Sequence, residues 1–250
     1  MATLRPRNHS AVAQGPLACA VRRSFAWGAS VRRGRVFHPR GVGFHAEARL
    51  QPRAIGLLAR QERLEAIVRI SRGVGLPDWF PDFNGIAVRL LDAHGASRHQ
   101  DLLLVSAPMA PVVRHVLFPV PFQGWTGHSS ILPYRTPSGL RMLGALPFTS
   151  PTTAAGLRSS PPRELTLVGA DMLGRWEPEV SLVLGATLDD ALTEALELHP
   201  WHTGDDFVPA GVLNRLRIPA YDASQAARRR VRAENEAPST SRDSNGRSRQ

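Results

Sequence analysis

Six segments of the chain alternate apolar and polar side chains, and this period of two constrains the fold more than any other feature. Successive side chains of a β-strand point to opposite faces, so each segment offers one face to a core and one to solvent or a covering layer. Turn-forming residues separate the segments, notably at 73–81, 92–97 and 147–162. The pattern predicts an α+β protein, mainly β, built on a central antiparallel sheet that is closed or strongly curled. The six segments are Phe44–Leu50, Glu65–Ser71, Gly85–Leu91, Leu102–Ser106, Arg163–Gly169 and Glu179–Leu188.

Helical spacing of apolar residues is confined to a few short stretches. We expect helices over Ile55–Leu64, Asp189–Leu198 and Ala223–Val231. These would be peripheral to the sheet, because none is long enough to form a separate helical core.

The strong positive charge lies at the two ends of the chain. The formal net charge is +10, every basic residue is arginine, and residues 1–40 hold eight arginines and no acid. We therefore expect an Arg-rich disordered tail at 1–34, a folded domain at 35–230 and a second disordered tail at 231–250. Between the tails the charge is close to neutral, so we do not expect nucleic-acid binding as the main function.

Cysteine content and hydropathy indicate in which cellular compartment the protein is expected. Cys19 is the only cysteine, which excludes a disulfide framework and a thiolate zinc site and suits a reducing compartment such as the cytoplasm. No apolar run approaches the roughly 20 residues that span a bilayer, so we expect no membrane segment.

Three local motifs are similar to known catalytic or binding motifs, but each lacks a feature that the known motif requires. Residues 127–131, Gly-His-Ser-Ser-Ile, lack the second glycine of a nucleophile elbow and are interpreted as a loop. His199 and His202 flank Pro200, which opposes the helix that would aim both imidazoles at one metal, so a structural loop is favoured. The Gly-x-Gly pairs at 41–43 and 73–75 lack a phosphate-binding pattern and are interpreted as turns or bulges.

A fourth motif is compatible with metal chemistry. In a helix Arg217 and Tyr221 would lie on one face, four residues apart. A guanidinium beside a phenol favours the phenolate, which is a suitable ligand for ferric iron. An arginine stacked on a tyrosine is also a common surface arrangement, and Pro219 between the two disturbs a regular helix unless it lies in the first turn.

The order of several segments resembles the catalase superfamily. Residues 35–43, Arg-Val-Phe-His-Pro-Arg-Gly-Val-Gly, resemble the catalase segment that carries the distal histidine. Val68–Ser71 and residues 81–90, Pro-Asp-Phe-Asn-Gly-Ile-Ala-Val-Arg-Leu, resemble a second catalase run. Asp101–Leu103, Leu117–Pro119 and then Arg217-x-x-x-Tyr221 follow in the family's order. The chain is therefore similar to a short catalase that lacks the wrapping segment and the terminal helical domain.

This resemblance implies an eight-stranded antiparallel β-barrel with a few peripheral helices and a b-type haem (haem b) in a side pocket. By the same analogy His38 is the distal acid/base, and Ser71 hydrogen-bonds its imidazole. Tyr221 binds the iron with Arg217 beside it. The remaining haem contacts would come from Arg35 and Arg69, which pair with propionates, and from Phe118, which stacks on the porphyrin.

Each assignment has a structural alternative. Arg69 and Arg89 could be outward-facing strand residues, Ser71 could merely end its strand, Phe118 could fill the barrel mouth, and His38 could be a core or turn histidine.

One departure bears on the reaction. Catalases place an asparagine beside the distal histidine to hold peroxide, and here that position is Val105, followed by Ser106. We therefore expect a haem-dependent, peroxidase-like oxidoreductase whose small-molecule partner is hydrogen peroxide or an organic hydroperoxide. The alternative is a haem-free catalase-fold protein with a small-ligand-binding or hydrolytic, phosphodiesterase-type role. The sequence leaves a homo-oligomer open.

Overall fold

The computed structural model describes residues 40–52, 61–73, 80–120, 126–148, 151, 153–205 and 207–211. All of them belong to one compact unit, Val36–Ile218. The expected helix Ala223–Val231 and both expected tails lie outside the described residues.

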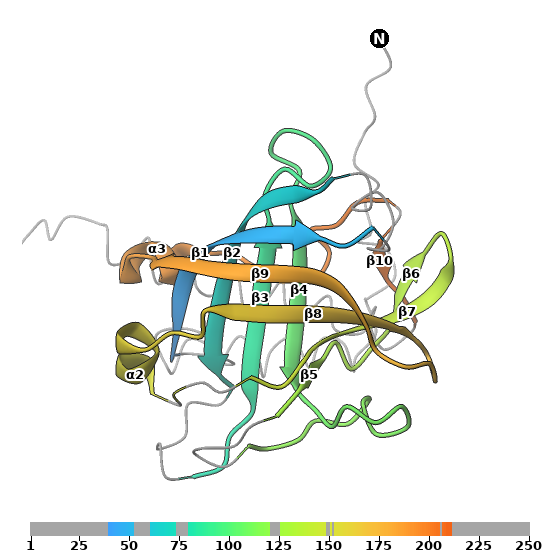
Figure 1. Ribbon diagram of the computed structural model, residues 1–250, viewed down its shortest axis with the longest axis horizontal. Coiled ribbons are helices and arrows are strands. Elements are labelled where there is room, and N and C mark those ends of the chain that lie inside the picture. The colour runs from blue at the N-terminus through green and yellow to red at the C-terminus, as the bar shows by residue number, and fades with distance from the viewer. Residues whose placement is uncertain are drawn as a thin grey trace, which may run out of the picture. The chain divides into compact units, whose positions relative to one another are not determined.

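Eight strands close into an antiparallel barrel (Figure 1). Their order around the barrel is β7-β5-β4-β3-β2-β1-β9-β8, and β8 pairs back onto β7. The short strands β6 and β10 extend the sheet beyond the outer edge of β7 at one end. The bounds are β1 Arg40–Leu50, β2 Arg63–Arg72, β3 Asn84–Leu90, β4 Gln100–Ser106, β5 His128–Ser129, β6 Tyr134–Thr136, β7 Gly139–Ala145, β8 Glu164–Asp171, β9 Glu177–Thr187 and β10 Val208–Pro209.

Two short helices accompany the barrel, α2 (Ala154–Ser159) and α3 (Asp190–Ala195). Thr153 caps α2 by accepting a hydrogen bond from the Gly156 amide, and Asp189 caps α3 by accepting one from the Ala191 amide. In the part of the chain that the structure describes, no helix is long and apolar enough to cross a membrane.

All six segments predicted as strands are strands of the barrel, which confirms the fold class. The expected helix Asp189–Leu198 is confirmed in shorter form as α3. The expected helix Ile55–Leu64 is wrong at its end, because Arg63 and Leu64 pair in β2; residues 53–60 lie outside the described part. The turn-rich stretch 147–162 contains α2, whose Thr153 cap offsets the poor helix propensity around it.

The core is the inside of the barrel. On β2, for example, Ala66, Val68 and Ile70 alternate with outward residues and are buried against the facing strands. A valine or isoleucine side chain buried in this way contributes about 1.5–3 kcal/mol. The opposite face of the same strands is therefore the surface on which a site can form.

Candidate functional site

Four strands bring together, on the outer face of the barrel, residues from separate parts of the sequence. Gly41 lies opposite Ser71, Ser71 opposite Gly85, and Gly85 opposite Val105 in the strand register. Their strand neighbours belong to the core, so this row faces outward. We call these four residues the outer row; it has small side chains and is the meeting point of the catalase-like segments.

Arg69 lies one step further along the same face. In the register it is opposite Gly43 of β1 and Ala87 of β3. It faces away from the barrel core, yet it is only 2% exposed. A Cβ built on Gly41 would lie 2.8 Å from the guanidinium carbon, so Arg69 can occupy this place only beside a glycine. The interpretation of Arg69 as an outward strand residue is therefore confirmed, although the residue is buried.

Ser71 is the penultimate residue of β2, which ends at Arg72. Its hydroxyl donates a long hydrogen bond of 3.4 Å to the carbonyl oxygen of Gly85, across the outer row. Ser71 therefore lies near the end of its strand, as the structural alternative expected, and it also joins two residues of the outer row. It is only 6% exposed and is held at a defined place in the row.

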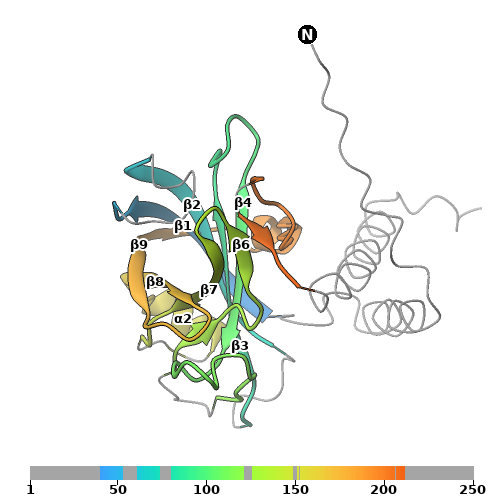
Figure 2. The same ribbon diagram turned by 90° about the vertical axis from the view of Figure 1, so that its right-hand side faces the viewer.

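A segment that we call the strap, Leu188–Gly204, crosses the outer face of β1 to β4 next to this row. It begins at β1, where the Leu188 amide donates to the Gly43 carbonyl at 2.8 Å. A Cβ on Gly43 would lie 2.7 Å from Thr193 Oγ1, so the strap packs directly on the β1 backbone. Glu194 then meets Arg69, with 3.7 Å between carboxylate and guanidinium. Figure 2 shows the orange strap on the side of β4 that faces away from β8 and β9.

The far end of the strap is bound by Asp101 of β4, which is fully buried. Its carboxylate accepts two hydrogen bonds from Arg89, both 2.7 Å long, one from the His199 amide at 2.9 Å and one from the His202 imidazole at 2.9 Å. Burial alone would raise the pKa of Asp101, but the hydrogen bonds of Arg89 and His202 lower it below its ordinary value. The segment around His199 and His202 is therefore a structural loop, as the sequence analysis favoured.

Phe118 lies in the connection that follows β4. Its amide donates to the Ser106 carbonyl at 2.9 Å, and the Ser106 hydroxyl donates to the Phe118 carbonyl at 2.6 Å. The side chain is 49% exposed. Phe118 therefore does not fill the barrel mouth; its ring is on the surface, next in sequence to the exposed Leu117.

Two interpretations of local motifs need correction. His128 and Ser129 were expected in a loop, but they form β5, both are buried, and they pair with β4 and β7 to complete the barrel. Gly41 and Gly43 were expected in turns or bulges, but both lie in the continuous pairing of β1 with β2. Their role is the close approach of Arg69 and of the strap.

Of the residues assigned by resemblance, Arg69 and Ser71 lie in adjacent rows of the outer face, and Phe118 is in the connection after β4. Arg35, His38, Arg217 and Tyr221 lie outside the described residues. The sequence pattern predicted part of the strap as a helix but not as a layer over the site. One signal was available: Asp101 is a polar residue at the start of an apolar run.

The comparisons with known proteins agree with this architecture. Catalase A from Saccharomyces cerevisiae is similar in structure with a TM-score of 0.52 and 11% sequence identity, over 78% of this chain and 60% of the catalase chain. A bacterial catalase gives a TM-score of 0.52 and 12% identity, over 87% of this chain and 62% of the other. The chain thus spans about 60% of the length of these catalases and has a catalase-like fold. No family model and no curated protein matches its sequence.

Proposed function

We propose that the chain is a haem-dependent, peroxidase-like oxidoreductase that acts on hydrogen peroxide or an organic hydroperoxide. The observation that carries this proposal is the outer row with Arg69 beside it. Three segments that resemble catalases contribute Gly41, Ser71 and Gly85 to one row on one face of a catalase-like barrel.

The described part of this face fits a haem. A porphyrin is flat, and the outer row offers a wall of small side chains, two of them glycines. A haem propionate needs a fixed cation with forked donors, and Arg69 is a buried guanidinium on that wall. Its partner Glu194 is 3.7 Å away and 54% exposed, so this carboxylate can yield the place to a propionate. A half-exposed Phe118 ring is available at the surface for contact with the porphyrin.

In the proposed site Tyr221 would bind the iron, with Arg217 holding the phenol ionised, and Arg35 would bind a second propionate. The haem, when bound, supplies the redox chemistry of peroxide reduction. The chain's own part is the movement of a proton between the two peroxide oxygens, which an imidazole with a pKa near neutrality performs well. We assign that role to His38, with Ser71 as the group that fixes its tautomer.

Val105 decides which reaction is favoured. It stands where catalases have the asparagine that holds peroxide, and a valine side chain has no hydrogen-bond donor. Ser106 cannot replace it, because its hydroxyl donates to the Phe118 carbonyl and accepts from the Asn84 amide at 3.1 Å. We therefore propose peroxidase-type turnover rather than rapid disproportionation. The same observation supports the second candidate, a haem-free barrel that binds a small apolar ligand on this face.

The test is to express the full chain with haem precursor and to record its absorption spectrum. Tyr221→Phe should alter or abolish the Soret band. The chain has only two tyrosines, so Tyr134→Phe is the matched control and should leave the band unchanged. His38→Ala should keep the haem and lose the peroxide reaction, and Arg69→Gln should weaken haem binding.

These spectra distinguish the haem enzyme from the haem-free barrel. A Soret band that Tyr221→Phe changes and Tyr134→Phe does not would support the haem enzyme. A colourless protein that also fails to bind added haem would refute it and leave the haem-free barrel. Equal effects of both tyrosine substitutions would refute Tyr221 as the ligand.

A further inference from the structure

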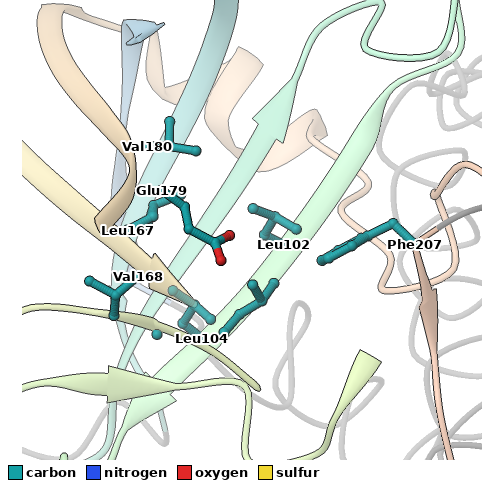
Figure 3. Close-up of a pocket in the computed structure, with 9 residues that line it drawn as sticks. Leu102, Leu104, Leu167, Val168, Glu179, Val180 and Phe207 are labelled. Carbon is teal, nitrogen blue, oxygen red and sulfur yellow. The ribbon is translucent and has the colours of Figure 1, made fainter. Parts of the chain in front are cut away.

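The inside of the barrel has little free space. Its cavity measures about 20 Å³, which is enough for about one water molecule, and lies between β4, β7, β8 and β9. Figure 3 shows the carboxyl group of Glu179 directed toward Leu102, Leu104 and Phe207. Glu179 is only 4% exposed, and Arg141 donates a hydrogen bond to its Oε1 at 2.8 Å. A partner larger than water therefore has to bind on the outside of the described barrel.

The connection after β4 carries a cluster of exposed apolar side chains. In the described part of the chain ten large hydrophobic side chains are exposed, and five of them lie between residues 112 and 118. Val112 is 77% exposed, and Leu173, in the turn between β8 and β9, is 72% exposed. Single exposed apolar side chains are common, but a cluster of them marks an interaction surface. We call Val112, Val113, Val116, Leu117 and Leu173 the apolar edge.

Buried contacts hold the two segments of the apolar edge together. Arg114 of the connection is fully buried and donates to the Gly174 carbonyl of the turn at 2.7 Å. Its guanidinium carbon lies 4.1 Å from the centre of the Trp176 ring, and the Trp176 indole donates to the Met109 carbonyl at 2.7 Å. Figure 1 shows the connection and the turn at its right-hand side. The exposed apolar side chains are therefore carried by segments that are fixed from beneath.

The stretch of sequence around the connection has only positive charges. Residues 102–163 contain five arginines and no acid. One of these arginines, Arg135 of β6, is exposed and forms no ion pair with another described residue. The same is true of Arg175, which lies two positions after Leu173 in the turn between β8 and β9.

The acids near the apolar edge are on β8 and β9. Asp171 ends β8 and is paired with Arg141 at 2.9 Å, so its charge is largely offset. Glu177 begins β9 and is exposed. Because Arg141 is opposite Asp171 in the register, the β6–β7 hairpin with Arg135 lies beside the turn with Arg175. Two unpaired arginines thus flank the apolar edge.

An apolar surface flanked by arginines fits a lipid bilayer with anionic headgroups. The apolar side chains gain free energy when they leave water for the acyl boundary, and arginines are attracted to the negative surface potential. A second copy of the chain fits less well, because it would bring the same arginines against each other.

We propose that the apolar edge docks the protein on the surface of a membrane that contains anionic phospholipids. The apolar side chains of the edge enter the boundary between headgroups and acyl chains, and Arg135 and Arg175 contact headgroup phosphates. This docking is independent of the haem proposal.

The test is flotation of the full chain with vesicles of phosphatidylcholine alone and of an equal mixture of phosphatidylcholine and phosphatidylserine, at about 0.15 M salt. The natural chain should bind the mixed vesicles more tightly than the neutral ones. Val112→Asn and Leu173→Asn should each weaken binding to the mixed vesicles about tenfold, because a polar side chain does not gain from leaving water. Both positions are exposed, so the variants keep the fold.

Leu192→Asn is the matched control. Leu192 is a 58% exposed leucine of α3, which Figure 1 shows on the opposite side from the turn between β8 and β9, and its substitution should leave binding unchanged. Arg175→Gln should weaken binding to the mixed vesicles severalfold and leave binding to neutral vesicles unchanged, whereas Arg98→Gln, in the β3–β4 turn, should have no effect. Every variant keeps the arginines of residues 1–40, so their contribution is the same throughout.

Three results would overturn the proposal. The first is a natural chain that does not float with the mixed vesicles. The second is equal binding by the natural chain, Leu173→Asn and Leu192→Asn, which would assign any binding to other arginines of the chain. The third is a natural dimer in size-exclusion chromatography that Leu173→Asn converts to a monomer without a change in vesicle binding, which would assign the apolar edge to a second copy.

Discussion

Replacing Glu179 by Gln should remove a pH dependence of stability that the natural chain has, so that the variant gains stability relative to the natural chain as pH rises from 4.5 to 8. In the folded state the pKa of Glu179 is raised from 4.5 to about 7, mainly by burial. The folded state therefore binds the proton more tightly than the unfolded state between these two pH values, so the free energy of unfolding falls as pH rises through that window. A factor of ten in proton affinity is worth about 1.36 kcal/mol, so the whole effect is about 3 kcal/mol.

Urea unfolding followed by tryptophan fluorescence at half-unit steps from pH 4.5 to pH 8 measures this directly. The difference in unfolding free energy between Glu179→Gln and the natural chain should increase by about 3 kcal/mol over that range, with the increase centred between pH 5 and pH 7. Glu65→Gln should run parallel to the natural chain. If the curves of Glu179→Gln and the natural chain are parallel too, Glu179 is not a buried carboxyl group and the reasoning fails.

Three further predictions concern the outer face. Val105→Asn places an amide in the outer row and should raise peroxide disproportionation by about tenfold or more in the haem-loaded protein, which oxygen release measures; Leu103→Asn in the neighbouring row is the control and should not. Glu194→Gln removes a carboxylate beside Arg69 and should tighten haem binding severalfold in a spectral titration, whereas weaker binding would contradict a propionate at that place. Asp101→Asn leaves the Arg89 guanidinium without its carboxylate and should cost about 3 kcal/mol in urea unfolding at pH 7. Because the pKa of Asp101 is lowered, this difference should shrink only in acid, below the ordinary value of 3.8.

The strands that the sequence revealed are those with two distinct faces. Glu65–Ser71 and Gly85–Leu91 alternate cleanly because one face enters the core and the other carries Arg69, Ser71 or Arg89. The strand Gly139–Ala145 escaped prediction because Met142, Leu143, Gly144 and Ala145 are all buried, which removes the alternation. His128–Ser129 is too short to show any period, and its partners in β4 and β7 stabilise it.

The sequence could predict residues of the candidate site only where a short motif resembled a segment of a known family. An arginine two positions before a serine, in a strand that resembles a catalase segment, pointed to Arg69 and Ser71; the structure places both on the outer face of β2, and their roles stay predictions. Glu179 was included in a predicted strand, but its inward direction depends on one extra residue in the pairing with β8, and a bulge of this kind leaves no period in the sequence. The strap was predicted only as a helix, because its binding to Gly43 and Asp101 joins residues about 100 to 150 positions apart.

The strap also limits what the outer face can bind. The row beside the outer row contains Gly43, Ala87 and Leu103 together with Arg69, and without a cover the apolar side chains of this row would be exposed to water. The strap, which is part of the same chain, covers this row. Its hydrogen bonds to the Asp101 carboxylate hold the strap in place. The outer row lies next to this covered row, so a ligand proposed for it would be bounded on one side by Glu194 and Arg69. A flat ligand with an acidic edge fits that boundary, because its acid can take the place of the Glu194 carboxylate while its face rests on glycine and serine. The proposed haem would therefore be oriented by the strap as well as by the strands, because Glu194 of the strap and Arg69 of β2 together mark one edge of the outer row.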